Sequence, residues 1–317
     1  MKKANRAKIA EIYSNYGIFF ILLIVFVISC IVVPNFATMD NLFSIINQNS
    51  ITVVLACGIT MLIISGNIDL SAGMLMIVAN VTCAFVLQQT GNVLLACVAA
   101  CAIAVAGEMI NGAAISYLGL NGFIVTLATQ LIYKGTALLI CNGTPIYGAS
   151  QITFLAQSRL AGIPVLIVIM FICTFVVHFV LNKTSFGRYL YAIGGNSFTA
   201  KASGINVKLT VFINFVIMGI FAGLAGILYT ARANSGQPTS ADITFDAIIA
   251  TVLGGTSMSG GSGLIAGTVA GALVVGIINN IMNLGGVSPY FQNIVKGGII
   301  FLAIFIDKKT RETIMKV

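Results

Sequence analysis

The segment NKTSFGRYLYAIGGNSFTAKASGINVKL, residues 182–209, separates two long apolar runs and contains no acidic residue. Its basic residues are Lys183, Arg188, Lys201 and Lys208. Because Lys and Arg in short loops resist translocation, we predict that this segment lies on the cytoplasmic side of a membrane. We expect a short helix over 198–203, capped by Asn196 or Ser197 and ended by Gly204 in a left-handed turn. Such an ordered helix on a cytoplasmic loop indicates a docking partner.

The composition places the whole chain in a membrane. Of its 317 residues, 58% are hydrophobic and only 8% are charged, compared with about 25% charged residues in soluble domains. Apolar runs near the ~20 residues that a membrane-spanning helix needs recur along the chain. We therefore predict an all-α, polytopic membrane helical bundle. It forms one transmembrane domain over 1–317, with its membrane-spanning region at 17–306.

We predict about ten spans with both termini cytoplasmic. The predicted spans are 17–33, 42–64, 74–87, 93–118, 123–140, 165–181, 210–230, 243–259, 264–284 and 290–306. The first is long and lacks a small-residue cleavage pattern, so we interpret it as a span and not as a signal peptide. At about 1.5 Å per residue, 243–259 only just crosses the hydrocarbon core. The alternative is that this stretch is re-entrant.

Charge and cysteine usage exclude other classes. The net charge of +8 is concentrated at the two ends and in 182–209, which is the distribution of positive-inside topology and not of a nucleic-acid surface. The seven cysteines show no CxxC spacing, so we interpret them as small buried residues. We expect no metal and no cofactor.

Two glycine-bounded polar breaks interrupt the apolar runs, at 66–73 and at 254–263. Broken helices at corresponding positions often mark transport pathways, so the pair suggests a duplicated architecture. Gly254 and Gly255 fit no nucleotide-binding fingerprint, and we expect flexible or close-packed backbone there. Small residues spaced four apart, such as Gly219 and Gly223, indicate tight helix packing.

Polar residues inside the spans are candidates for a translocation pathway. A charge at bilayer depth costs roughly 2.5–3.5 kcal/mol, so Glu108 must face protein or water. We expect either a structural ion pair with Lys134 or a substrate contact. The other candidates are amides, whose alternative role is hydrogen bonding between helices. The full candidate set is Asn80, Glu108, Asn111, Gln130, Asn214, Asn279 and Asn280.

Further polar residues lie beside the breaks. Asn67, Asp69 and Ser71 precede a predicted helix, where Asp and Ser are ordinary caps; a pathway or interface role is the alternative. Asp246 is interpreted as a cap of the segment that follows it, with a polar role at the outer mouth as the alternative.

Five motifs in order resemble the permease subunits of bacterial ATP-binding-cassette (ABC) importers of the ribose type, within the branched-chain amino acid and ribose binding-protein-dependent transport family. They are GNIDLSAG (66–73), NGFIVTLAT (121–129), TSFGRYLYAIGGNSFTAKASGI (184–205), FDAIIATVLGGTSMSGGSG (245–263) and QNIVKGGII (292–300). The resemblance covers nearly the whole chain. Two departures from the family pattern leave the sugar undefined. Asn67 and Ala72 stand where Gly and Val are frequent in the family, and Thr199-Ala200-Lys201-Ala202 stands where the family more often has paired alanines and an arginine.

The resemblance implies a subunit of the bacterial inner membrane that moves a monosaccharide, a ribose-like pentose or related sugar, by alternating access. Its implied partners are a cytoplasmic ATP-binding subunit, an extracytoplasmic sugar-binding protein, a second permease copy or paralogue, and membrane lipid. The residues implied in ATPase coupling are Arg188, Asn196, Ala200, Ala202 and Gly204. The chain has no GxxxxGK[ST] loop, so we expect no ATPase site of its own and no enzymatic activity.

Two other functions remain as alternatives. An ion-coupled secondary sugar transporter would bury a relay of acids and histidines, for which only Glu108 and His178 qualify. A membrane scaffold or receptor would move no solute.

Overall fold

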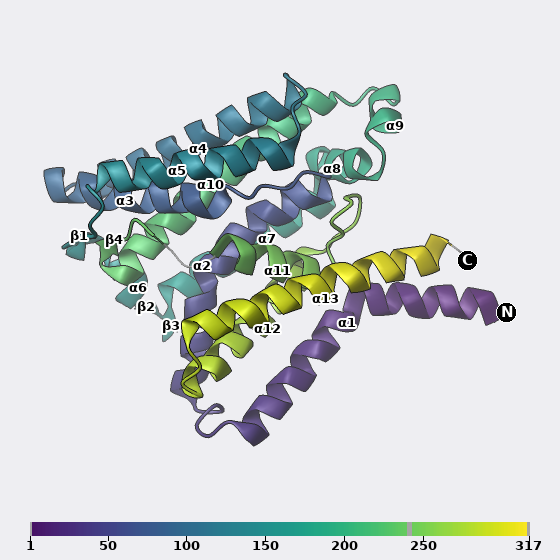
Figure 1. Ribbon diagram of the computed structural model, residues 1–317, viewed down its shortest axis with the longest axis horizontal. Helices are drawn as coiled ribbons and strands as arrows, with labels where there is room; N and C mark the ends of the chain where they lie inside the picture. The colour runs from purple at the N-terminus through teal and green to yellow at the C-terminus, as the bar shows by residue number, and fades with distance from the viewer. Residues whose placement is uncertain (1, 240–242, 316–317) are drawn as a thin grey trace.

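The computed structural model describes residues 2–239 and 243–315, with side chains described for 17–239, 243–302 and 305. The described chain is almost entirely helical (Figure 1). Its helices are α1 (Lys2–Val32), α2 (Met39–Ile64), α3 (Ala72–Thr90), α4 (Val93–Ser116), α5 (Gly122–Ile140), α6 (Phe154–Gln157), α7 (Val165–Lys183), α8 (Ser185–Gly195), α9 (Ser197–Ala202), α10 (Val207–Ala233), α11 (Ile243–Leu253), α12 (Ile265–Leu284) and α13 (Pro289–Met315), with a 3-10 turn η1 at Ser150–Ile152.

Short strands tie the connecting loops together at two places. β1 (Ile146–Tyr147) pairs antiparallel with β4 (Ser235–Gly236), with Ile146 opposite Gly236. β2 (Arg159–Leu160) pairs with β3 (Ile163–Pro164) to form a small hairpin. The first pair joins the loop after α5 to the loop after α10.

Capping side chains set several helix starts. Asn92, Asn121 and Asn206 each precede a long helix and accept a hydrogen bond from a backbone N–H of its first turn, at 3.1, 3.0 and 3.1 Å. Side-chain oxygens at this position satisfy donors that have no partner within the helix. The polar residues between apolar runs therefore fix where the helices begin.

Seven described helices are long and apolar enough to cross a membrane: α2, α3, α4, α5, α7, α10 and α12. The polytopic all-α prediction is confirmed at this level. The predicted span 243–259 is wrong in its extent, because α11 ends at Leu253 and has only 11 residues. At about 1.5 Å per residue it covers about 16 Å, roughly half of a hydrocarbon core. A glycine-rich loop then leads to α12.

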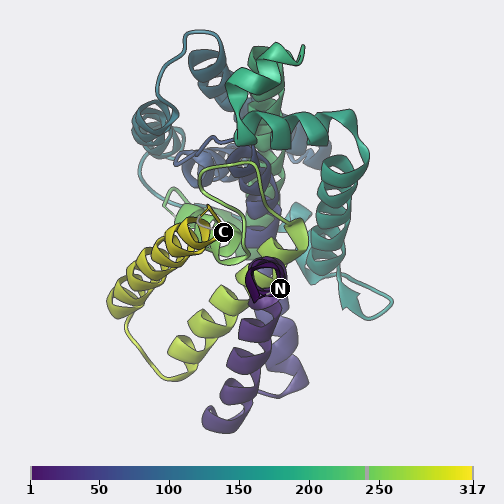
Figure 2. The same ribbon diagram turned by 90° about the vertical axis from the view of Figure 1, so that its right-hand side faces the viewer.

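The helices form two groups around α2. In Figure 1, α3, α4, α5 and α10 pack together in the upper part, while α1, α12 and α13 lie in the lower part. Figure 2 shows the two groups diverging when the molecule is turned. α2 contacts both α10 and α12, and all its residues from Ile51 to Ile64 are buried. It is therefore the central helix of the bundle.

Small residues bring α10 against its neighbours. A Cβ atom at Gly219 would come within 2.7 Å of the Cα of Val105, and one at Gly223 within 2.9 Å of the Cα of Cys101. Both neighbours lie on α4, so the predicted close packing through glycine is confirmed.

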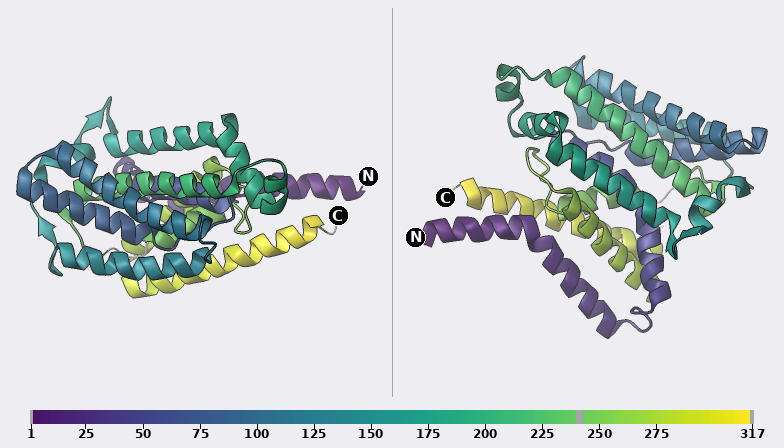
Figure 3. Two further views of the ribbon diagram at one scale, coloured as in Figure 1. Left: turned by 90° about the horizontal axis from the view of Figure 1, so that it is seen from above. Right: turned by 180° about the vertical axis from the view of Figure 1, so that it is seen from behind.

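The two ends of the molecule differ. α8, α9 and both marked chain ends lie at one end, whereas β1, β4 and α6 lie at the other (Figures 1 and 3).

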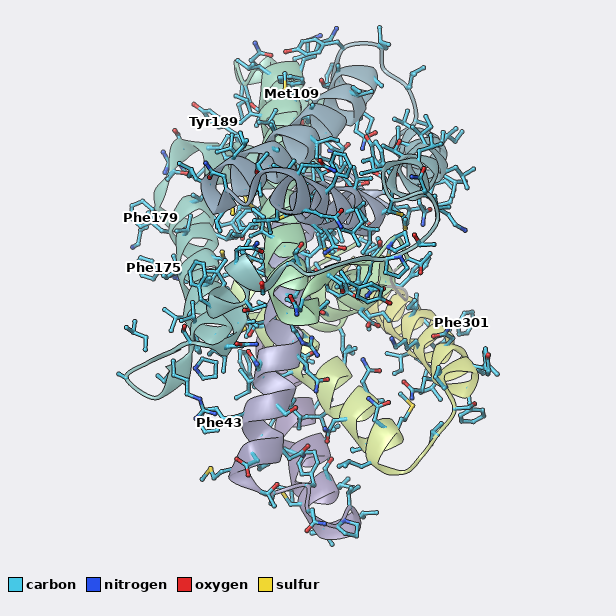
Figure 4. The ribbon with its side chains drawn as sticks, turned by 90° about the vertical axis from the view of Figure 1, so that its left-hand side faces the viewer. Phe43, Met109, Phe175, Phe179, Tyr189 and Phe301 are labelled. Atoms are coloured by element: carbon cyan, nitrogen blue, oxygen red, sulfur yellow. The ribbon has the colours of Figure 1, made fainter. Side chains whose placement is uncertain are left out.

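Between these ends, large apolar side chains cover the outside. Phe43, Phe175, Phe179 and Phe301 point away from the bundle in Figure 4 and are 40–71% exposed. A belt of this kind suits contact with lipid.

Candidate functional site

The segment between α7 and α10 folds into two short helices with defined caps. Thr184 accepts a hydrogen bond from Gly187 N at 3.2 Å at the start of α8, and Asn196 accepts one from Thr199 N at 3.0 Å at the start of α9. Gly204 adopts a left-handed φ of +85° immediately beyond α9. The predicted capped helix with its glycine end is thus confirmed, with Asn196 as the cap and the helix one residue earlier than expected.

One face of this segment is free for a partner and the other packs on the bundle. Arg188, Asn196, Ala202 and Gly204 are exposed. Ala200 is buried at 4% exposure and packs within this chain. Phe198, which the sequence analysis did not single out, is 81% exposed on α9. A large apolar residue in an otherwise polar loop was the signal that could have identified it.

The end of α8 meets both glycine-bounded breaks. A Cβ atom at Gly194 would overlap the carbonyl oxygen of Ile64, the last residue of α2, and one at Gly260 would lie 2.9 Å from the Cα atoms of both Gly66 and Gly194. The N–H of Gly261 donates to Ile64 O at 2.9 Å. Three backbones therefore converge here. We refer to Ile64–Gly66, Gly194–Gly195 and Gly260–Gly261 as the glycine junction.

Tyr191 on α8 reinforces this contact. Its hydroxyl donates to the carbonyl of Gly263 at 2.9 Å, in the loop that follows α11. Burial raises the pKa of Tyr191 above its ordinary value, so the donor keeps its proton over the physiological range. This bond ties α8 to the loop between α11 and α12.

A cavity of about 580 Å³ lies beside the glycine junction. Its walls come from the α2–α3 connection, the C-terminal end of α4, the N-terminal end of α10 and the α8–α9 turn. The polar residues among its lining are Ser65, Asn67, Ser116, Asn196, Ser197, Lys208 and Ser259. It is therefore a polar space between the exposed α9 and the loops that follow α2 and α11.

The buried polar residues Asp69, Ser71, Glu108 and Asn111 form one network. Asp69 Oδ1 accepts from the Ser71 N–H at 2.7 Å and from its hydroxyl at 2.6 Å. Asn111 Nδ2 donates to Ser71 Oγ at 2.9 Å and to Glu108 Oε2 at 3.3 Å. The expected ion pair of Glu108 with Lys134 is wrong, because Lys134 is exposed on the outer side of α5 while Glu108 is fully buried. Asp69, and not a cation, is its neighbour.

Three of the candidate amides connect helices. Asn80 donates to Thr230 Oγ1 at 2.8 Å and accepts from Gln237 N at 2.7 Å. Asn214 donates to Met61 O at 3.0 Å, at the end of α2. Asn280 and Asn41 exchange two amide hydrogen bonds of 2.8 and 3.1 Å. These contacts match the interhelical alternative.

The remaining candidates lie apart from one another. Gln130 and Asn279 are half-buried on α5 and α12. Asn67 donates to Ser65 Oγ at 3.1 Å within its own loop. Asp246 on α11 forms an ion pair with Lys296 of α13 at 2.9 Å, which neither sequence interpretation included.

Gly254 and Gly255 close the interrupted helix. A Cβ atom at Gly254 would overlap the backbone of Gly267 on α12, and Gly255 has a φ of +89°. The close-packed interpretation is confirmed for Gly254, whereas Gly255 is exposed and takes a left-handed conformation.

These features define a class of protein. A bundle of membrane-length helices presents the capped, exposed helix α9 at the end where the loops after α2 and α11 meet. The sequence contains no nucleotide-binding motif. Such an arrangement is the one expected of a membrane permease subunit.

Comparison with known proteins identifies the family. Residues 41–304 match the family described as branched-chain amino acid transport system / permease component, and the chain belongs to this family. It is 38% identical to the ribose import permease protein RbsC of Escherichia coli K12, over 91% of this chain and 92% of that protein. It is 36% identical to the D-allose transport system permease protein AlsC of the same strain, over 94% and 93%. The L-arabinose transport system permease protein AraH, also from that strain, is 36% identical over 94% and 92%. No solved structure matches this chain.

The chain is accordingly a multi-pass inner-membrane permease subunit and not an enzyme.

Proposed function

We propose that this permease carries a monosaccharide, a ribose-like pentose or related sugar, into the cytoplasm as part of an ATP-driven importer. The observation that carries the proposal is the capped α9, which exposes Phe198 outward and packs Ala200 inward. The named sugars of the similar permeases, ribose, allose and arabinose, support the substrate class.

The proposed coupling passes from α9 to α8 and then to the glycine junction. An ATP-binding subunit that presses on Phe198, Arg188 and Ala202 displaces a compact element held by caps at both helix starts. Gly194 is in backbone contact with the end of α2. No side chain lies between the two backbones to take up the displacement of α8. The α2–α3 and α11–α12 connections therefore move together, which gives alternating access.

A second copy or paralogue completes the pore in this proposal. Lys134 is exposed on the surface of α5, near the middle of a membrane-length helix. A charged side chain facing lipid at that depth costs about 2.5–3.5 kcal/mol on the lenient scale. Gln130 lies one turn away on the same face. We infer that this face borders water between two permeases.

The proposed topology has ten membrane segments with both termini cytoplasmic, α11 being a half-length segment. It is supported by the location of α8, α9 and both chain ends at one end of the molecule (Figure 3). Reporter fusions near Arg188 and Arg311 are expected to read cytoplasmic, and one near Gln151 external. The reverse pattern would overturn this topology.

Reconstitution in vesicles tests the function. The permease is combined with its cognate ATP-binding subunit and binding protein, and uptake of labelled ribose, allose and arabinose is measured. We expect uptake of one of these sugars. This uptake should require ATP on the membrane side that carries the ATP-binding subunit, and it should continue when a protonophore is added. Uptake without the ATP-binding subunit that a protonophore abolishes would establish the secondary transporter instead. An absence of uptake of any sugar would favour a scaffold.

A further inference from the structure

Two acidic side chains meet in the interior without a cation. Asp69, between α2 and α3, is 1% exposed, and Glu108, on α4, is 0% exposed. Their carboxyl groups are close neighbours in one hydrogen-bonded network: Asn111 Nδ2 donates to Glu108 Oε2 and to Ser71 Oγ, and the Ser71 hydroxyl donates to Asp69 Oδ1. Among the side chains that the structure describes, no lysine, arginine or histidine lies within ion-pair distance of either one. Two ionised carboxylates in such contact would repel each other strongly.

The surrounding hydrogen bonds leave oxygens unused. The described donors reach Oδ1 of Asp69 and Oε2 of Glu108, while Oδ2 of Asp69 and Oε1 of Glu108 have no donor. The buried Oδ1 of Asn111, whose amide nitrogen binds both Ser71 and Glu108, also lacks a donor. An ionised carboxylate only accepts hydrogen bonds. A contact between the two carboxyl groups therefore requires a proton on one of them.

We propose that Asp69 and Glu108 form a buried proton-binding pair, in which Glu108 carries the proton and donates it to Oδ2 of Asp69. One proton supplies a donor where the two carboxyl groups otherwise offer only acceptors, and it reduces the charge of the pair to minus one.

The assignment of the proton follows from the donors around each group. Asp69 receives two hydrogen bonds from Ser71 and lies at the N-terminus of α3, where the helix dipole favours a negative charge. Glu108 receives one longer bond from Asn111, in the middle of an apolar helix. The charge therefore resides on Asp69 and the proton on Glu108.

Other titratable groups do not replace this proton. Tyr133 of α5 is the neighbouring titratable side chain, but its hydroxyl donates to Gly107 O at 2.9 Å and so is used. Lys134 is exposed. A bound Ca²⁺ would take six to eight oxygen ligands and Mg²⁺ six, whereas this network leaves three described side-chain oxygens without a donor.

The pair connects the helix break to α4. Asp69 belongs to the connection that leads from the glycine junction to α3, and the proton holds this connection against Glu108. Loss of the proton places two like charges in contact and releases the connection from α4. The proposal does not depend on which sugar is carried or on what drives transport.

Infrared spectroscopy of the purified permease near neutral pH tests the proposal, because exposed carboxyl groups are then ionised. We expect one carbonyl band of a protonated carboxylic acid that shifts in D₂O. Glu108→Gln should abolish the band, and Asp69→Asn should keep it at a shifted frequency. The matched control Asp40→Asn alters an exposed carboxylate at the start of α2 and should leave the band unchanged.

Three results would overturn the proposal. One is the absence of the band in the unaltered protein. If the melting temperature of that protein also rises with NaCl but not with N-methylglucamine chloride, a bound cation occupies the site in place of the proton. Another is a band that persists in Glu108→Gln. If Glu108→Gln does not accumulate, Asp69→Asn decides: a band at the original frequency contradicts a hydrogen bond between the two groups.

Discussion

Gly261 donates its backbone N–H to the carbonyl of Ile64 at 2.9 Å, across 197 positions of sequence. Ile64 ends α2, the central helix, and Gly261 lies in the loop that follows the half-length α11. This bond joins the two broken segments of the chain to each other. Gly194 of α8 packs on the same carbonyl. α8 is thus in direct backbone contact with both glycine-bounded segments.

Gly194→Ala tests this contact. The added methyl group would overlap Ile64 O, so α8 must move away from α2, and overpacking of this kind costs about 1–3 kcal/mol. We expect a lower melting temperature and weaker stimulation of the cognate ATPase by sugar-loaded binding protein. Gly195→Ala is the matched control, since a Cβ atom there has no neighbour within 4 Å. Equal behaviour of the two variants would contradict a tight junction.

Local sequence rules predicted much of the coupling segment. The cap at Asn196, the short helix and the left-handed Gly204 each depend on residues within one turn of one another, so the sequence contains the needed information. The burial of Ala200 does not follow from such local rules, because it depends on which face of α9 packs against the rest of the bundle. That choice is made by packing and not by the helix itself.

The Glu108–Lys134 prediction failed for a related reason. Hydropathy places both residues inside spans at compatible depths, but it does not give the rotation of each helix. Tyr133 is buried, and the next residue lies about 100° further around the helix, which turns Lys134 outward. The length of α11 was overestimated because the span 243–259 was predicted from its hydropathy and from the need for a further crossing. That prediction did not account for the backbone turn at Gly254 and Gly255, which ends the helix.

Phe198→Ala tests the docking surface. Truncating an aromatic anchor at the centre of an interface commonly costs more than about 1–2 kcal/mol, or roughly tenfold or more in affinity. We expect co-purification with the ATP-binding subunit to fall while the melting temperature of the isolated permease stays within its error, because the side chain is 81% exposed. The control Phe154→Ala removes a 51% exposed phenylalanine at the opposite end of the molecule. Unchanged affinity in Phe198→Ala would exclude α9 as the anchor.

Gly204 tests whether the shape of the turn after α9 is needed for coupling. No atom lies within 4 Å of a Cβ at this position, so a substitution acts through the backbone φ of +85° and not through a clash. A left-handed conformation costs a β-branched residue roughly 1–2 kcal/mol, whereas asparagine tolerates it better. We therefore expect Gly204→Val to reduce sugar-stimulated ATPase activity and Gly204→Asn to retain most of it. Similar losses in both variants would point to a missing contact and not to backbone strain.

Lys134→Cys tests the proposed pore face of α5. In the assembled complex we expect this thiol to react with a membrane-impermeant maleimide, because the native ammonium group needs water at this depth. Ile132→Cys is the control: its side chain is 61% exposed but lies about 200° away around the helix, toward lipid. Labelling is measured as the increase over a parent that retains the seven native cysteines, which are buried or half-buried in the structure. If Ile132→Cys reacts and Lys134→Cys does not, the aqueous face of α5 is the opposite one, and the second permease must lie on that side.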